Sequence, residues 1–367
     1  RIDVLPFGGF YDENEQKESV EKTKKRVAMT LNNGHHSVYD HISISLNIKN
    51  IPKILAMVIN NEHQYTTSEK SARYTKIVAD DSGIITEAEV MLYEKWIDIF
   101  KEKIKELYSS EFNDSKVEKL AQENARYLVT VFMPTEMIYS TSLRQINYIA
   151  SWFKVYMSKD NKNDFEEKLS KYMSEFISEL ERLNLLNEGL MKNDKFRTIS
   201  LFGTNLDKNK DYFSNIYETT YKASFAYFAQ AQRHRTLDYK MQILKNKEYF
   251  IPPIIEDDKE LVSEWLNDMD IVSSVYPQGE LVLITESGKY EDFILKCKER
   301  LCSSAQLEIM NKTKEILHNY SNYLNETNNP LAKDIKKYLK GARCTFKDFV
   351  CTSDCKFKAG KLLDRKI

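Results

Sequence analysis

The amino-acid sequence predicts an α+β protein in which one strand–helix unit occurs twice. Residues 42–48 alternate apolar and polar side chains with the period of a half-buried strand, and a helical pattern follows from Pro52. Residues 215–221 alternate in the same way and lead into another helix, about 172 positions further along the chain. A unit that recurs at a fixed offset indicates an internal duplication. We therefore expect two domains, residues 1–190 and residues 191–367.

Helical patterns account for most of the remaining sequence. The spacing of apolar residues predicts helices at 15–33, at two places within 87–124, and at 163–183, 258–269 and 291–327. Residues 184–210 are a mixed polar stretch, and the boundary between the two domains falls within it.

The helix that is predicted to begin near Ala223 ends in Arg-His-Arg. Successive helical residues are about 100° apart, so Gln230, Arg233 and His234 share one face. Ala223 and Ala226 beside them would leave room for a flat, anionic ligand. The alternative interpretation is a helix end that carries basic residues because they suit the helix dipole.

Composition excludes several classes of partner. The chain has 367 residues, with 54 basic and 55 acidic side chains, so no overall charge attracts nucleic acid or a membrane. No stretch approaches 18 consecutive apolar residues, and the first residues lack a charged leader followed by an apolar run. We expect a cytoplasmic protein that binds neither nucleic acid nor membrane.

Histidines and cysteines cluster in two places, but neither cluster predicts a metal site. Residues 34–41 hold three histidines with no carboxylate or cysteine set beyond Asp40. The tail contains Cys344, Cys351 and Cys355, whose spacing is not that of a zinc ribbon, and the five cysteines of the chain are odd in number. We expect reduced structural cysteines and no bound metal.

Short motifs of this chain resemble those of the flavin-dependent thymidylate synthase family, in the family's order. Asp40 stands where the family usually has Glu, Ser142 where it has Asn, and Phe153 where its next arginine would fall. The motifs are Gly-His-x-Ser-x-x-Asp-His at 34–41, Glu-x-Ser-x-Arg-Tyr at 69–74, Ser-x-Arg at 142–144 after Arg126, Gln-x-x-Arg-His-Arg at 230–235, and Arg-x4-Ala-Gln-x-Glu-Ile at 300–309.

The resemblance implies roles for individual residues. Residues 69–74 combine a hydroxyl, backbone N–H groups and an arginine, which suit a phosphate, although a polar surface loop would have the same composition. The implied cofactor-binding residues are His35, Ser37, Arg144, Arg233, His234 and Arg235. The implied substrate-binding residues are Glu69, Ser71, Arg73, Arg126, Gln230 and Arg300, of which Gln230 and Arg300 also carry the catalytic role.

The resemblance also implies a fold and a reaction. Each repeat would be a mainly antiparallel sheet with long helices. The enzyme would be a methyltransferase that uses FAD, NADPH as reductant and methylenetetrahydrofolate as one-carbon donor to convert dUMP to dTMP. Family sites are assembled between the subunits of a homotetramer, so two duplicated chains would form a homodimer that acts as a pseudo-tetramer.

The two repeats have lost different motifs. The first has Asn61-Glu62-His63 where Arg-His-Arg belongs, and the second has no Glu-x-Ser-x-Arg-Tyr. We therefore expect one composite site per chain, with one FAD and one dUMP, and an empty second half-site in which Glu62 repels phosphate. Two alternatives stay open: a flavin- or nucleotide-binding pseudoenzyme, and C5 modification of another pyrimidine nucleotide, because residues 237–239 depart from the family.

Overall fold

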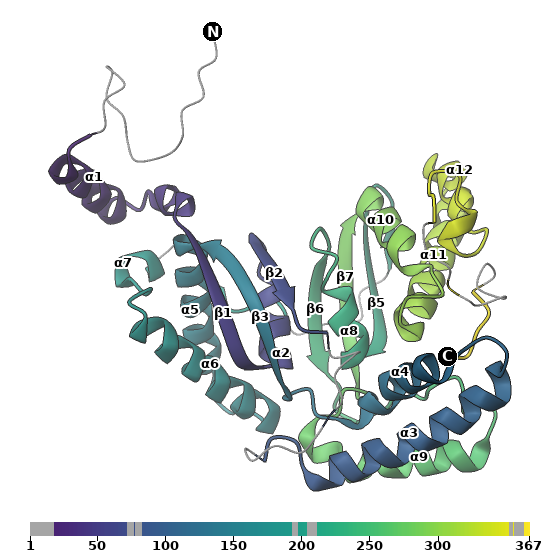
Figure 1. Cartoon of the computed structure of the whole chain (residues 1–367). Helices are drawn as coiled ribbons and strands as arrows, with labels where there is room; N and C mark the ends of the chain where they lie inside the picture. Colours follow the sequence, from purple (N-terminus) through teal and green to yellow (C-terminus); the bar gives the residue numbers. More distant parts are fainter. Residues whose placement is uncertain are drawn as a thin grey trace.

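The protein folds into two antiparallel sheets that lie side by side with helices around them (Figure 1). The structure is a computed structural model, and it describes residues 18–71, 77, 83–192, 197–203, 211–351, 355 and 363–367. The α+β prediction is confirmed. In the described part of the chain no helix has the length and apolar character that crossing a membrane requires.

The first sheet has three strands in the order β1-β3-β2. They are β1 (Ser43–Pro52), β2 (Tyr65–Glu69) and β3 (Pro134–Ser142). Side chains of β1 alternate between exposed and half-buried, as the sequence pattern predicts. Helix α2 (Lys53–Asn60) follows β1 directly, and each of its eight residues is buried.

The second sheet has four strands in the order β4-β5-β7-β6. They are β4 (Tyr212–Phe213), β5 (Ile216–Ser224), β6 (Asp238–Ile243) and β7 (Leu281–Lys289). Helix α8 (Phe225–Ala231) follows β5 as α2 follows β1. The helix predicted from Ala223 is wrong at its start, because Ala223 belongs to β5 and Ser224 caps α8 by accepting a hydrogen bond from the backbone N–H of Tyr227.

Long helices cover the outer faces of both sheets and form a layer below them (Figure 1). The single helix predicted at 291–327 is interrupted at residues 301–306, because Gln306 caps a new helix by accepting from the backbone N–H of Ile309. The other α-helices are α1 (Val20–Asn32), α3 (Glu87–Tyr108), α4 (Asp114–Ala125), α5 (Leu143–Met157), α6 (Asp164–Arg182), α7 (Glu188–Met191), α9 (Lys259–Ile271), α10 (Tyr290–Arg300), α11 (Leu307–Glu326) and α12 (Leu331–Ile335). Short 3₁₀ helices are η1 (His36–His41), η2 (Arg126–Leu128), η3 (Ser273–Val275), η4 (Lys336–Tyr338) and η5 (Arg343–Thr345).

The chain segments that precede β3 and β7 pair with each other. Gln278 N–H donates to the carbonyl of Val129 at 2.8 Å, and Gly279 N–H donates to the carbonyl of Tyr127 at 2.7 Å. The largest hydrophobic core runs across this junction, where the ring of Phe165 on α6 stacks on Phe225 of α8 with 6.1 Å between centroids. The two halves of the chain therefore share one interior.

The edge strands β2 and β6 face each other at the centre of the molecule (Figure 1). Arg235 Nη2 donates to the carbonyl of Thr67 at 3.0 Å, and Asn61 Nδ2 donates to the carbonyl of Tyr239 at 2.9 Å. Each contact joins the segment after one short helix (α8 or α2) to the edge strand of the other sheet. The two halves of the chain therefore contact each other at the centre through two similar interfaces, one formed by Arg235 and Thr67 and the other by Asn61 and Tyr239.

The cysteines fall into two groups by exposure. Cys297 and Cys302 are buried, whereas Cys344 and Cys351 are exposed. The predicted structural role therefore fits Cys297 and Cys302 and does not fit the two exposed residues. In the described ranges no cluster of histidine, cysteine or carboxylate side chains is arranged to hold a metal ion.

Candidate functional site

A buried carboxylate holds the N-terminal end of helix α8 in place. Glu308 of α11 accepts hydrogen bonds from the backbone N–H of Ser224 at 2.8 Å, from its hydroxyl at 2.5 Å and from the Tyr127 hydroxyl at 3.0 Å. Burial raises the pKa of Glu308, and these hydrogen bonds oppose the rise. Because Tyr127 precedes β3 in the first half, the carboxylate links both halves of the chain to the start of α8.

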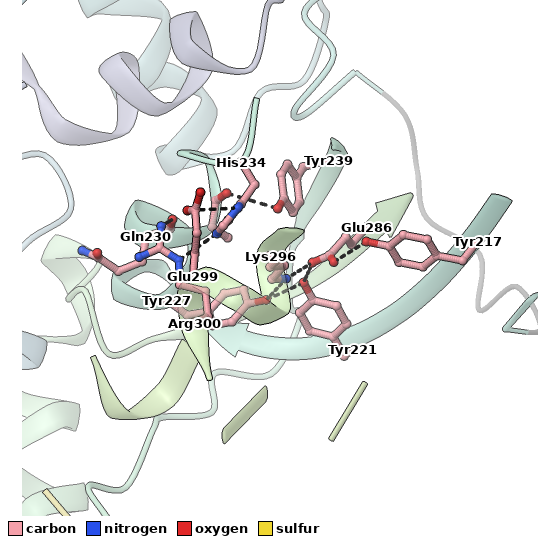
Figure 2. Close-up of polar contacts among 11 residues, drawn as sticks. Tyr217, Tyr221, Tyr227, Gln230, His234, Tyr239, Glu286, Lys296, Glu299 and Arg300 are labelled. Atoms are coloured by element: carbon pink, nitrogen blue, oxygen red, sulfur yellow. Dashed lines mark hydrogen bonds and ion pairs between the residues drawn. The ribbon is translucent and has the colours of Figure 1, made fainter. Parts of the chain in front are cut away.

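Half-buried Arg300 and the buried His234 and Gln230 form a cluster at the other end of α8 (Figure 2). Arg300 Nε donates to His234 Nε2 at 2.7 Å, and Arg300 Nη2 donates to the backbone carbonyl of Gln230 at 3.1 Å. Burial, followed by the charge of Arg300, lowers the pKa of His234 to about 2. His234 is therefore neutral, accepts at Nε2, and carries its proton on Nδ1, which lies 3.7 Å from a carboxylate oxygen of Glu299.

The predicted common face of Gln230, Arg233 and His234 is not formed as a helical face. Helix α8 ends at Ala231, and the three predicted cofactor residues Arg233, His234 and Arg235 lie in the turn after it. Arg233 is exposed, whereas Gln230 and His234 are buried. Ala223 and Ala226 are also packed in the interior and leave no open surface for a ligand.

Gln230 has an unsatisfied acceptor inside this cluster. Its side-chain Oε1 is buried and has no hydrogen-bond partner within the described part of the chain. A buried amide oxygen without a donor is costly, about 1–3 kcal/mol. A ligand N–H group, such as a ring imide, would satisfy it.

The first half supplies a second group of charges to the same region. Lys53, the first residue of α2, forms a buried ion pair with Glu69 of β2. Burial lowers the pKa of Lys53, and the nearby charges of Arg233 and Arg126 lower it further. Lys53, Arg126 and Arg233, which come from both halves of the chain, thus interact electrostatically in this region. Arg233 is exposed, and a guanidinium group pairs well with the oxygens of an anion.

Arg235 joins the two halves directly. Besides its contact with the carbonyl of Thr67, its guanidinium lies 5.2 Å from the ring centroid of Tyr65 on β2. Burial raises the pKa of the Tyr65 hydroxyl to about 12, so it stays protonated. Arg235 therefore holds the turn after α8 against strand β2.

Other predicted cofactor residues lie elsewhere. His35 precedes η1 and Ser37 lies within it, both are exposed, and η1 leads into the outer edge strand β1. Arg144, at the start of α5, forms an ion pair with Asp40 at 2.8 Å and lines a cavity beside residues 61–63. Within the described part of the chain, no hydrogen bond or ion pair joins these residues to Arg233.

The predicted phosphate segment lies partly outside the described residues. Glu69 ends β2 and pairs with Lys53, and Ser71 follows it. Arg73 lies outside the described residues. Arg126 is buried in η2.

Two buried lysines, Lys53 and Lys296, were not predicted from the sequence as part of a site. Lys53 was readable as a charge at the start of an otherwise apolar helix, which is an unusual place for an unpaired lysine. Lys296 of α10 pairs with Glu286 of β7 at 2.6 Å, and Tyr217 and Tyr221 donate to the same carboxylate at 2.6 and 2.5 Å (Figure 2). No local pattern marks Lys296, because its partners lie on β5 and β7.

The predicted empty half-site contains a large cavity of about 830 Å³. It lies between residues 61–64 of the first half and residues 238–240 of the second. Glu62, expected there as an unpaired carboxylate, is in fact paired: Arg197 Nη2 donates to Oε2 at 2.6 Å and Ser200 N–H donates to Oε1 at 2.7 Å. The physical reason for expecting this half-site to stay empty is therefore wrong.

Fold and site together define an α+β protein with a cationic, partly buried cluster between two antiparallel sheets. The family model of the thymidylate synthase complementing protein matches residues 7–177. The matched range contains the predicted residues from His35 to Arg144 and stops short of α8. A comparison with curated proteins finds no match.

Proposed function

We propose that the chain is a flavin-dependent thymidylate synthase, a methyltransferase that makes dTMP from dUMP with methylenetetrahydrofolate and NADPH. The observation that carries the proposal is the cationic cluster in which Lys53, paired with Glu69, and Arg126 of the family-matched region lie within electrostatic range of Arg233 of the second half. A nucleoside monophosphate brings the dianion that such a cluster neutralises, and a uracil brings the N–H that Gln230 Oε1 lacks.

The chain's own residues would bind and orient the nucleotide. Arg233, Arg126 and Arg73 are assigned to the phosphate, where guanidinium groups form paired hydrogen bonds with oxygen. Lys53 neutralises Glu69, so the carboxylate does not repel the phosphate. Arg300 and Gln230 are assigned to the uracil, and neutral His234 keeps the guanidinium of Arg300 in place by accepting from Nε.

Exposed Arg233 and the neighbouring Arg235 suit the anionic diphosphate of a flavin dinucleotide in charge. Arg233, His234 and Arg235 would hold FAD on the side of the second half, and His35, Ser37 and Arg144 would do so from the first. When bound, the reduced flavin supplies the hydride and relays the one-carbon unit, and NADPH restores it. The protein's contribution is positioning and charge neutralisation, which are large terms in such chemistry.

A duplication of the synthase unit, divided near residue 190, is part of the proposal. Three features support it: strand order β1-β3-β2 is matched by β5-β7-β6, a short buried helix follows the first strand of each unit, and the contacts across the centre are reciprocal. Thr67 and Tyr239, the two acceptors in those contacts, are 172 positions apart, the offset of the two strand–helix units.

We further propose that a second chain completes each flavin site. Within one chain Lys53 lies in electrostatic range of Arg233, and Arg235 contacts Thr67, whereas His35 and Ser37 lie beside the outer edge strand of the first sheet. A cytoplasmic homodimer that acts as a pseudo-tetramer would bring them to the other chain's Arg233. The expected stoichiometry is one FAD per chain.

The absorbance spectrum of the purified protein tests the cofactor, and product formation tests the reaction. We expect flavin bands at one FAD per chain, and dTMP formation that requires dUMP, methylenetetrahydrofolate and NADPH. Arg300→Ala should abolish turnover, while Arg182→Ala, an exposed arginine paired with Glu179 on α6, should leave it unchanged. A protein that binds no flavin refutes the proposal, and a yellow protein without turnover is a flavin-binding pseudoenzyme.

A further inference from the structure

A cavity lies between the two halves of the chain, and Arg233 is not among the residues that line it. Its volume of about 830 Å³ is that of a small-molecule site, and its walls come from α5, from the turn after α2, from β6 and from residues 197–203. It contains neither Gln230 nor Arg300. The cavity therefore shares neither of these residues with the cluster assigned to dUMP, while Arg144, which the proposed function assigns to FAD, stands in its wall.

One wall of the cavity is a stacking platform. The guanidinium of Arg197 lies 3.3 Å from the ring centroid of Trp152, and the pair with Glu62 holds it there. The Arg197 side chain remains 40% exposed, so one of its faces is open. A guanidinium plane supported by an indole is a surface on which a heteroaromatic base stacks.

The remaining charges of the cavity favour an anion. Arg144, Arg197 and Lys240 line it with only two carboxylates, Glu62 and Asp238. Both carboxylates have partners, since Glu62 pairs with Arg197 and Asp238 lies 2.8 Å from His63 Nε2. Arg197 and Arg144 are likewise paired, with Glu62 and Asp40, so Lys240 is the cation of this wall that the described contacts leave for an anionic ligand.

An unsatisfied donor completes the site. The Nε1 atom of Trp152 is buried and has no hydrogen-bond partner in the described part of the chain, although the residue is only 2% exposed and lines the cavity. A buried N–H without an acceptor costs about 1–3 kcal/mol. An oxygen atom of a ligand would satisfy it.

We propose that this cavity binds a nucleoside 5′-phosphate, as a second nucleotide site of the chain. The base stacks on the open face of Arg197, and the phosphate lies toward Lys240. Ligand binding here bridges residues 61–64 and 238–240, so it strengthens the contact between the two halves.

Fluorescence titration with AMP and UMP tests the proposal on the full chain. Trp152 reports binding, because Trp96 and Trp265 are fully buried against each other in the helical layer. We expect quenching that is lost in Trp152→Phe and that persists in Arg233→Ala, in which the proposed substrate site is disabled. Persistence in that variant separates this site from the proposed active site.

Calorimetry on matched variants decides which residues bind. Arg197→Met and Lys240→Met should each weaken AMP or UMP binding about 10-fold or more, the loss expected for a charge-assisted hydrogen bond. The control Arg182→Met replaces an exposed arginine of α6 and should leave affinity unchanged. Circular dichroism confirms that each variant is folded.

Three results would overturn the assignment. One is that neither nucleotide binds at millimolar concentration. Another is that Arg197→Met and Lys240→Met bind as the unaltered protein does. The third is that inorganic phosphate binds as tightly as AMP and UMP, because the base would then contribute nothing.

Discussion

Replacing Lys296 by methionine tests whether its buried ion pair holds the second sheet to α10. Lys296 and Glu286 are both fully buried, and removing one partner of such a pair costs about 3–5 kcal/mol because the other charge is left without compensation. Tyr217 and Tyr221 still donate to Glu286 in the variant, so we expect the lower part of this range, about 3 kcal/mol.

Urea unfolding followed by circular dichroism measures the loss. The matched control is Lys222→Met on β5, which breaks an exposed pair with Glu248 and should cost no more than about 1 kcal/mol. A second substitution, Glu286→Gln, should restore part of the stability of Lys296→Met by removing the unpaired charge. Since burial without a cation raises the pKa of a carboxyl group, the deficit of Lys296→Met should also shrink as pH falls. A loss of unfolding free energy below about 1 kcal/mol in Lys296→Met would show that the ion pair does not hold the second sheet to α10.

Other predictions concern the proposed active site. The pKa of His234 is about 2 in the folded protein, whereas that of an unfolded histidine is about 6.5, so between these pH values the unfolded state binds more protons. The free energy of unfolding should therefore fall by about 1.4 kcal/mol per pH unit as pH decreases through this range. Urea titrations at several pH values measure this loss, and His234→Asn should remove it. Arg73→Ala should weaken dUMP binding about 30- to 1000-fold with little effect on FAD, and calorimetry that finds dUMP affinity unchanged would leave residues 69–74 as a surface loop. Co-expressed Arg73→Ala and Arg233→Ala chains should stay inactive, because both residues serve the site of the same chain. Co-expressed His35→Ala and Arg233→Ala chains should instead recover one active site per mixed dimer. Recovery of activity in the first pair would place the nucleotide site between chains.

The fold was predictable where local pattern and burial agree. The alternation at residues 42–48 and 215–221 follows from single-chain periodicity, and β1 and β5 occur there. The errors fall where a polar side chain decides the boundary. Ser224 begins α8 later than the pattern suggests, and Gln306 begins a new helix inside one continuous helical pattern.

The site was predictable only in its parts. Short motifs identified Arg233, His234 and Arg300 as candidates, but their arrangement depends on a helix that ends at Ala231 and buries His234. The partner of Glu62 was beyond reach of the sequence, because Arg197 lies 135 positions away in a polar stretch without a pattern. Contacts of this kind are set by the packing of the halves and leave no periodic signal.

The pairing of the segments before β3 and β7 limits how the chain can change over evolutionary time. Backbone groups of residues 127–131 find their partners in residues 276–279, and the aromatic interior is continuous across that seam. A single half released by truncation would expose an unpaired backbone edge and a large apolar surface, so it would not be stable on its own.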